Sequence, residues 1–325
     1  MKTPDTIHCV CNIDDAYLRH CIVTLTSLFE NNPGEPIHVH IIAASLSEAA
    51  QESIADTARR YGQECSFHIV GDRFDGLCPV AADGYISAAT YFRCFLPSIL
   101  PETVDKAIYI DCDLLVVGNI RPFWNIDIKG YAVGAVEDMW SGKPEHYQRL
   151  QYPESDAYFN AGVLLLNLGY WRENDIEEEI KAYIKEHPDR LLYNDQDALN
   201  GVLHSRRKLI PFRWNMQDGF FRRKRKIRPS TIEEVDREMP HTAIIHFTGS
   251  KKPWHDNCLH PCRKLYFKYL DMTPMAGWRP KINYQIFLHD ETITYHSLTD
   301  SCILIRSFCS RSRNSAAREI TGCGC

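Results

Sequence analysis

The stretch Ile7-His8-Cys9-Val10-Cys11-Asn12-Ile13 is an apolar, β-rich run, and the segments that follow it decide the fold. An amphipathic helical pattern at residues 17–31 precedes a second β-rich run at 37–43. A helical pattern at 47–61 then leads to a third β-rich run at 67–70. This β-α-β-α-β order predicts parallel strands joined by right-handed crossover helices. The fold class is therefore α/β.

The alternation continues beyond these segments with less regularity. We expect a helix at 88–96, ended by Pro97, and helices at 176–186 and 195–202, with strands at 107–110, 132–136, 162–166 and 243–247. After about residue 270 the pattern weakens and the chain becomes rich in arginine. We therefore expect one domain over residues 1–270 and an appended segment over 271–325 that contacts the acceptor or a membrane.

Composition excludes several classes of protein. The 325 residues carry 37 Lys and Arg against 42 Asp and Glu, a net charge of −5, which disfavours a general polyanion binder. No apolar run approaches the roughly 18 residues of a membrane-spanning helix, and the first residues lack a signal core. The 13 cysteines are odd in number and form no Cys-x-x-Cys pair, so we expect reduced thiols and no zinc site of that type. These observations predict a cytoplasmic protein.

Asp111 and Asp113 follow the predicted strand 107–110 directly. On an extended backbone both carboxylates project from the same face, while Cys112 points the other way. At the carboxyl end of a strand in an open α/β sheet, this pair is suited to a hard divalent cation that also binds phosphate oxygens. A solvated turn is the alternative interpretation of an isolated Asp-x-Asp motif.

Four motifs in a fixed order resemble those of one enzyme family. They are Tyr109-Ile110-Asp111-Cys112-Asp113-Leu114-Leu115-Val116, Tyr158-Phe159-Asn160-Ala161-Gly162-Val163-Leu164-Leu165-Leu166-Asn167, Asp195-Gln196-Asp197-Ala198-Leu199-Asn200 and His246-Phe247-Thr248-Gly249-Ser250-Lys251-Lys252-Pro253-Trp254. Together they resemble glycosyltransferase family 8, in particular the bacterial lipopolysaccharide galactosyl- and glucosyltransferases. The resemblance covers roughly residues 7 to 270.

The resemblance implies a GT-A fold, with a Rossmann-like, mainly parallel sheet flanked by helices. It also implies a UDP-sugar donor, UDP-galactose or UDP-glucose, and a Mn²⁺ or Mg²⁺ cofactor. The enzyme would be a retaining hexosyltransferase acting on a glycan or lipid-linked saccharide of the lipopolysaccharide type. The implied metal ligands are Asp111, Asp113 and His246. Taken alone, His246 on an apolar strand would be interpreted as a core histidine.

The residues after His246 are implied to bind the donor diphosphate. Lys252 matches the family lysine that stabilises the departing UDP, and Gly249 would let the backbone approach the phosphates. A solvated surface turn is the alternative for this segment. Cys112, between the two carboxylates, is placed in the same donor-binding set.

The turn after the first strand resembles the family's uridine-binding turn. Asn12, Asp14 and Asp15 are its candidate residues, and either aspartate would accept from the uracil imide or the ribose hydroxyls. Ile13 and Ala16 replace polar groups of some members, so the residue that contacts the base is left open. Capping of the helix that follows is a compatible role for both aspartates.

The donor sugar is implied to lie among Arg93, Asp138, Asn160, Asp195 and Gln196. Asp138, Asp195 and Gln196 are the candidate catalytic residues. Because the amide of Gln196 is a poor nucleophile, we favour substitution on the same face of the sugar, in which the departing phosphate takes the acceptor proton. Asn160 and Asp195 would otherwise serve as a turn residue and a helix cap.

The basic run at residues 222–228, preceded by Phe220 and Phe221, predicts contact with acceptor phosphates or with the anionic inner leaflet, and a solvated loop is the alternative. No nucleic-acid recognition module accompanies it. Two other functions compete with glycosyl transfer. One is a catalytically idle sugar-nucleotide-binding protein, and the other is a nucleotidyltransferase, which shares the sheet and the paired carboxylates but releases pyrophosphate.

Overall fold

The computed structural model describes residues 5–77, 88–221 and 227–280. Its main sheet has seven strands in the order β3-β2-β1-β4-β7-β6-β8. The strands are β1 (Ile7–Asn12), β2 (Ile37–Ala43), β3 (Glu64–Ile69), β4 (Lys106–Ile110), β6 (Val133–Glu137), β7 (Phe159–Asn167) and β8 (Arg207–Leu209). Strands β1 to β4 pair in parallel, β8 pairs in parallel with β6, and β7 runs antiparallel to both β4 and β6. The mainly parallel α/β sheet is confirmed.

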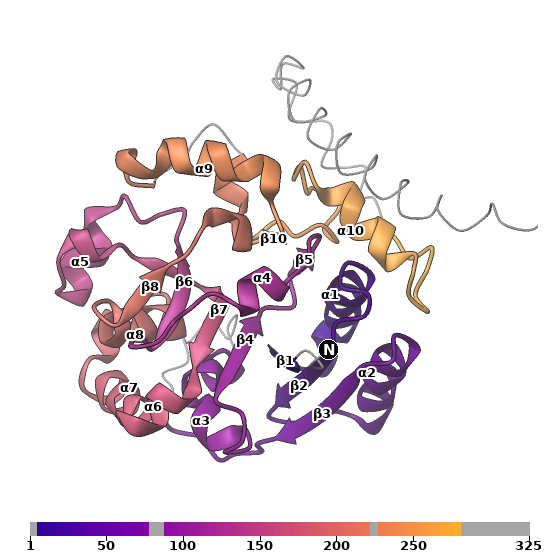
Figure 1. Ribbon diagram of the computed structural model, residues 1–325, viewed down its shortest axis with the longest axis horizontal. Coiled ribbons are helices and arrows are strands. Elements are labelled where there is room, and N and C mark those ends of the chain that lie inside the picture. Colours follow the sequence, from indigo (N-terminus) through magenta and orange to yellow (C-terminus); the bar gives the residue numbers. More distant parts are fainter. Residues whose placement is uncertain (1–4, 78–87, 222–226, 281–325) are drawn as a thin grey trace, which may run out of the picture.

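Helices surround the sheet (Figure 1). They are α1 (Leu18–Glu30), α2 (Glu48–Arg60), α3 (Leu96–Ile99), α4 (Arg121–Trp124), α5 (Pro144–Leu150), α6 (Leu168–Glu173), α7 (Ile176–Glu186), α8 (Asn194–Leu203), α9 (Ile232–Glu238) and α10 (Arg263–Leu270). In Figure 1, α1 and α2 lie on the right, α5 to α8 on the left, and α9 and α10 above. The side chain of Ser47 caps α2 by accepting from the N–H of Ala50 at 3.3 Å. Gly34 turns the chain after α1 with a φ of +77°, which glycine adopts without strain.

The alternation of β1 separates two hydrophobic layers. Ile7, Cys9 and Cys11 belong to the layer packed under α1 and α2, whereas Val10 belongs to the layer formed with β4, β7 and the helices α6 to α8. This period of two is what an extended strand imposes on its side chains. The carboxyl ends of β1 and β4 therefore sit between two packed layers, and the candidate residues follow these ends.

Three expectations about element boundaries were wrong in detail. Pro97 does not end a helix at 88–96. A 3-10 segment covers Ala88–Phe95, and Pro97 stands in the first turn of α3, where its missing N–H has no helical partner to lose. Strand β3 begins at Glu64, before the apolar run, because ladder pairing with β2 extends it through polar residues. Strand β7 likewise starts at Phe159.

A second sheet carries the candidate histidine to the carboxylates. It has the order β5-β10-β9, with β5 (Leu114–Val116), β9 (Met216–Gln217) and β10 (Ile244–His246). His246 is the register partner of Leu114, and the N–H of Phe247 donates to the carbonyl of Asp113 at 3.0 Å. The antiparallel pairing of β10 with β5 thus places residues far apart in the sequence beside one another.

The surface and the thiols agree in part with the expectations. The described cysteines are free thiols, as expected; the Cys323-Gly324-Cys325 end lies outside the described residues.

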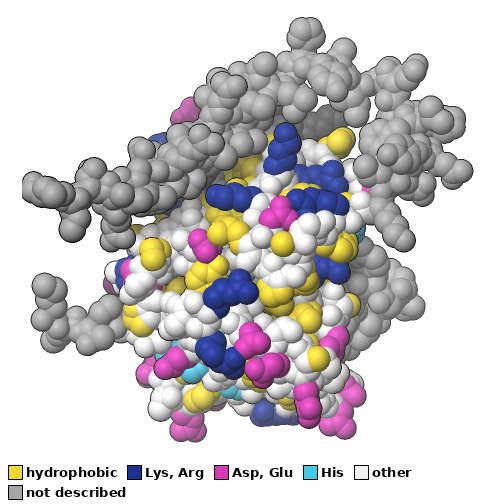
Figure 2. All heavy atoms as spheres, turned by 90° about the vertical axis from the view of Figure 1, so that its right-hand side faces the viewer, with side chains coloured by type: hydrophobic (Ala, Val, Ile, Leu, Met, Phe, Trp, Pro, Cys, Tyr) yellow, Lys and Arg dark blue, Asp and Glu magenta, His cyan; other side chains and the backbone are white. Residues whose placement is uncertain are grey.

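Of the helices in the described ranges, none is both long and apolar enough to cross a bilayer. Figure 2 shows Lys and Arg side chains mainly in the upper half of one face and Asp and Glu mainly below, so both signs of charge occur there.

Two further predictions concern the basic run and the domain boundary. Residues 222–226 lie outside the described residues, but Phe220 is fully buried, so its predicted place among surface cations is wrong. Arg228 is not free for phosphate either, because its guanidinium pairs with Glu137 at 2.8 Å. Met272, Met275 and Trp278 pack against the cluster that contains Tyr266. The appended segment 271–325 stays a prediction.

Candidate active site

Two carboxylates and one imidazole converge where β4 ends. His246 Nε2 lies 3.1 Å from Asp113 Oδ1 and 3.7 Å from Asp111 Oδ2. One ligand atom from each of the three residues lies within 4.8 Å of the others. His246 is buried, and its Nδ1 lies 2.9 Å from the side-chain oxygen of Asn215, which directs Nε2 at the carboxylates. This donor set fits a hard or borderline divalent ion with open positions for phosphate oxygens.

Lys252 sits at the same carboxylates. Its ammonium lies 2.6 Å from Asp113 Oδ2 and donates to the carbonyl of Phe247 at 2.6 Å. Burial alone would raise the pKa of Asp113, but Lys252 and His246 hold that pKa well below its usual range. Asp113 is therefore charged at neutral pH, and the Lys252 ammonium places a positive charge beside the cluster of Asp111, Asp113 and His246.

Arg93 is buried and bridges two acidic residues from different motifs. Its guanidinium lies 2.9 Å from Asp111 Oδ1 and 2.9 Å from Asp195 Oδ2, and it donates to the carbonyl of Ala161 at 2.7 Å. Burial raises the pKa of Asp195 to about 6, against the opposing charge of Arg93. Arg93 is thus no ordinary surface charge, and it connects the paired carboxylates to α8.

Asp138, Asn160 and Gln196 form one hydrogen-bonded group. Asp138 Oδ2 accepts from the amide of Asn160 at 3.0 Å and from the amide of Gln196 at 3.3 Å. The side-chain oxygen of Gln196 accepts from the N–H of Ala161 at 3.0 Å. Burial raises the pKa of Asp138. Two of the motifs and Asp138 therefore supply a polar cluster at the ends of β6, β7 and α8, adjacent to Asp111 through Arg93.

The turn after β1 divides its two aspartates between different partners. Asp14 Oδ1 accepts from the N–H of Tyr17 at 3.0 Å and caps the short 3-10 turn Asp15–Tyr17. Asp15 accepts from the N–H of Ser47 at 3.3 Å and so bridges to the start of α2. Asn12 ends β1, and its carbonyl lies 3.8 Å from the sulfur of Cys112. The predicted capping is present for Asp14, which caps the 3-10 turn, but Asp15 accepts from Ser47 instead, and α1 itself has no side-chain cap.

Cys112 and Gly249, both expected to bind the donor, have different surroundings in the structure. Cys112 is buried and belongs to the core cluster under α1, on the side away from the two carboxylates. Gly249 donates its N–H to Asp218 Oδ2 at 3.1 Å, and a Cβ at this position would overlap that carboxylate. A close backbone approach at Gly249 is therefore built into the loop.

Three residues of the site were not predicted from the sequence. Asn215 orients His246, but it precedes a strand of only two residues and carries no motif. A Cβ on Gly162 would overlap the His246 ring and the Asp111 carboxylate. Tyr17 is 40% exposed, and the negative charge of Asp113 contributes, after burial, to raising its pKa to about 12. An exposed aromatic ring following the uridine-like turn was the available signal for Tyr17.

Comparison with known proteins decides the family. The model of "Glycosyl transferase family 8" matches residues 8–258, which include all four motifs. The chain belongs to glycosyltransferase family 8. General stress protein A of Bacillus subtilis is 32% identical over 280 residues, covering 84% of this chain and 96% of that protein. The lipopolysaccharide 1,3-galactosyltransferase of Salmonella typhimurium is 24% identical and covers 84% of this chain and 80% of its own length.

A solved glycosyltransferase structure has a similar fold. The galactosyltransferase LgtC in complex with donor and acceptor sugar analogs matches with a TM-score of 0.75 and 29% identity. The match covers 82% of this chain and 96% of that chain. The family 8 resemblance and the GT-A-like architecture expected from it are confirmed, and the protein is a glycosyltransferase by family.

Proposed function

We propose that this glycosyltransferase moves a hexose, galactose or glucose, from a UDP-sugar to a glycan or lipid-linked saccharide, in a reaction that retains the anomeric configuration and depends on Mn²⁺ or Mg²⁺. The observation that carries the proposal is the convergence of Asp111, Asp113, His246 and Lys252 at the end of β4. The polar cluster of Asp138, Asn160 and Gln196 stands next to it. One end suits a diphosphate and the other suits sugar hydroxyls. Relatives named as lipopolysaccharide glucosyl- and galactosyltransferases support the donor and acceptor classes.

Asp111, Asp113 and His246 would hold the ion, which when bound neutralises charge on the diphosphate and on the departing UDP. Lys252 would turn from Asp113 towards the phosphate oxygens, because its ammonium lies within hydrogen-bond distance of the same carboxylate that would hold the ion. Burial of His246 and the hydrogen bond that its Nδ1 donates to the side-chain oxygen of Asn215 keep Nε2 aimed at the site without reorganisation. The chain itself would thus supply a positive charge, on Lys252, where the leaving group develops negative charge.

At the sugar end, Gln196 would orient or electrostatically support the anomeric centre. Its side-chain oxygen is held by the N–H of Ala161 and by Asn160, so the amide has a fixed direction. An amide is a poor nucleophile, which favours attack by the acceptor hydroxyl from the face that UDP leaves. Asp138 and Asn160 would accept from and donate to the hydroxyls of the sugar.

At the base end, Tyr17 would offer its exposed ring to the uracil, with Asn12 and Asp14 at the edge of the same turn. The Tyr17 ring packs edge-on against the Trp254 ring, with 6.2 Å between the centroids, and this contact fixes the orientation of the Tyr17 ring. Asp15 is the weaker candidate for the base because Ser47 already occupies its carboxylate.

The decisive experiment screens a panel of UDP-sugars for UDP release with and without Mn²⁺. We expect release with UDP-galactose or UDP-glucose that requires the ion and is abolished by Asp113→Asn. Asp105→Asn is the matched control, because the Asp105 side chain is 79% exposed and lies outside the site. Release of pyrophosphate instead of UDP would replace the proposal with nucleotidyl transfer. Tight UDP binding without any turnover would establish the idle binding protein.

Gln196→Ala tests the role at the anomeric centre. Because the amide would act on the transition state more than on the bound donor, turnover should fall at least about tenfold while the dissociation constant for UDP changes little. Steady-state kinetics and UDP titration by calorimetry measure the two quantities. An equal loss of turnover and UDP affinity would count against this role of Gln196.

A further inference from the structure

Four histidines share one face of the first three strands, and none of them belongs to the candidate active site at Asp111. His8 lies on β1, His38 and His40 on β2, and His68 on β3. His8 is the register partner of His38, and His40 follows two residues later on the same face. His8 precedes Asn12 by four residues, about 13 Å along an extended strand. His8 and His38 therefore lie near the opposite end of β1 from the uridine-like turn.

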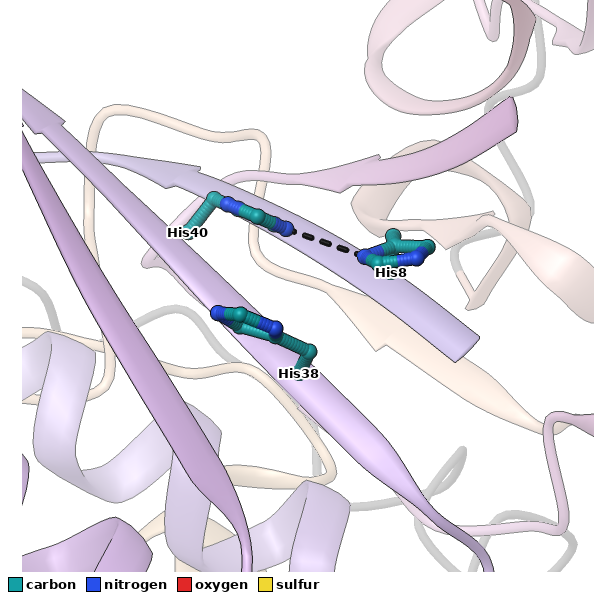
Figure 3. Close-up of side chains that lie close together, drawn as sticks. All are labelled: His8, His38 and His40. Atoms are coloured by element: carbon teal, nitrogen blue, oxygen red, sulfur yellow. Dashed lines mark hydrogen bonds between the residues drawn. The ribbon is translucent and has the colours of Figure 1, made fainter. Parts of the chain in front are cut away.

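Ring nitrogens of His8, His38 and His40 lie close together. Figure 3 shows His8 approaching His40 end-on, with the His38 ring alongside that of His40. His8 Nδ1 lies 3.0 Å from His40 Nε2, and the rings of His38 and His40 stack with centroids 4.3 Å apart. One ring nitrogen from each of the three lies within 4.8 Å of the others. Two imidazole nitrogens bound tetrahedrally to one zinc ion stand about 3.3 Å apart, so small ring rotations suffice to close the site.

We propose that His8, His38 and His40 form a binding site for a zinc-class transition-metal ion, separate from the carboxylate-rich site at Asp111. The chemistry of the donors separates the two sites. Three imidazoles suit Zn²⁺, Ni²⁺ or Cu²⁺, whereas Mg²⁺ and Mn²⁺ prefer oxygen ligands. The site joins neighbouring strands near the edge of the sheet, so a bound ion would tie β1 to β2.

The partners outside the three ligands fit a metal site. His40 Nδ1 lies 3.1 Å from His68 Nε2. His38 has Glu64 Oε2 at 3.2 Å from Nδ1 and Ser66 Oγ at 2.8 Å from Nε2. Whichever nitrogen of His38 takes the ion, the other has an acceptor for its proton. Such partners fix the ring orientation of ligating histidines in known metal sites.

The site is accessible from solvent. The His38 side chain is 22% exposed and that of Glu64 is 78% exposed, so an ion can enter from solvent and Glu64 can reach the fourth position. A metal ion binds the unprotonated nitrogen of a neutral imidazole. The ion would therefore replace the hydrogen bond between His8 Nδ1 and His40 Nε2.

The test is titration of the full-length protein with Zn²⁺ by calorimetry and with Co²⁺ by absorption spectroscopy. We expect the unaltered protein to bind one equivalent of Zn²⁺. The double variant His8→Asn/His38→Asn should bind Zn²⁺ with an affinity at least about tenfold lower. The exposed His241 provides the matched control His241→Asn, which should bind as the unaltered protein does. Asp111→Asn/Asp113→Asn should also keep this zinc equivalent, which makes the result independent of the proposed glycosyl transfer.

Zinc X-ray absorption of the unaltered protein removes any dependence on how the variants fold. Imidazole nitrogen scattering supports the site, and sulfur scattering would assign the zinc to cysteines and overturn it. Unchanged zinc affinity in the double variant, or the absence of bound zinc in the unaltered protein, would also overturn it. The four histidines would then be a hydrogen-bonded ladder that satisfies a polar sheet face.

Discussion

At the scale of single residues, Arg93 is the group on which two motifs depend. It neutralises Asp111 and Asp195, and each lies 2.9 Å from the guanidinium in a buried setting. Arg93→Met keeps most of the volume but leaves two carboxylates without their cation. Because removal of one partner strands a buried charge, we expect the free energy of unfolding to fall by about 3 to 5 kcal/mol, measured by urea denaturation.

Arg59→Met is the control for that measurement. Arg59 is 65% exposed and pairs with Glu52 and Asp56 on the surface of α2, so its loss should cost at most about 1 kcal/mol. Equal losses for the two variants would mean that the Arg93 pairs contribute no more than surface ion pairs do.

Gly162 packs directly against two of the candidate metal ligands. A Cβ there would overlap the His246 ring and the Asp111 carboxylate, so Gly162→Ala should push the imidazole out of line. We expect metal-dependent UDP release to fall at least about tenfold, because the arrangement of the candidate ligands Asp111, Asp113 and His246 is altered. Gly169→Ala is the control, since its Cβ would meet nothing closer than 3.7 Å. Comparable activity in the two variants would contradict the argument.

Some single residues of this site could be predicted from the sequence, and others could not. The motifs identified Asp111, Asp113, His246 and Lys252, because each stands at a fixed place in a recognisable pattern. Asn215 was not found, because only the pairing of β10 with β9 brings it beside His246, 31 residues away in the chain. Orientation of a ligand is a long-range contact, and local patterns do not contain it.

At the scale of elements, α8 is attached to the sheet by side-chain bonds to the backbone. Asn200 Oδ1 accepts from the N–H of Phe159 at 2.9 Å, and its amide donates to the carbonyl of Phe159 at 2.8 Å. The same amide donates to the carbonyl of Gln196, one turn earlier. Asn200→Ala would leave both buried backbone groups of Phe159 unpaired. We expect unfolding free energy to fall by about 2 to 4 kcal/mol and turnover to fall with it.

Asn125→Ala provides the comparison for Asn200→Ala, because Asn125 is an exposed asparagine at the end of α4. Chemical denaturation and steady-state kinetics measure the two effects. If Asn200→Ala were as stable and as active as Asn125→Ala, the docking of α8 through Asn200 would have to be abandoned.

Elements were predictable where periodicity was local. The run at 37–43 and the helix at 176–186 coincide with β2 and α7, because each has a clean pattern and clear ends. Strand β3 and strand β7 extend beyond their apolar runs, because ladder pairing with neighbours, which the sequence does not display, sets their length. The antiparallel direction of β7 is likewise a property of the assembled sheet.

At the scale of the whole molecule, buried neutral histidines connect the fold to pH. Burial lowers the pKa values of His20 and His40 from 6.5 to about 3. His20 packs against the Trp254 ring at 3.5 Å between centroids, and His40 lies in the sheet beside His8 and His68. Both rings are uncharged in the folded protein at pH values where they would be protonated in the unfolded chain.

The sign of the pH dependence follows from that difference. A histidine whose folded pKa lies below its unfolded value contributes stability that is complete above pH 6.5 and is lost as the pH falls towards 3. Each histidine can lower the free energy of unfolding by at most about 1.4 kcal/mol per pH unit in this range.

We expect the free energy of unfolding, measured by urea denaturation at pH 7, 6 and 5, to fall steadily below about pH 6.5. His20→Gln should flatten that decline, because it removes one group that protonates on unfolding, whereas the exposed His241→Gln should leave the slope unchanged. Parallel declines in all three proteins would show that other groups control acid stability.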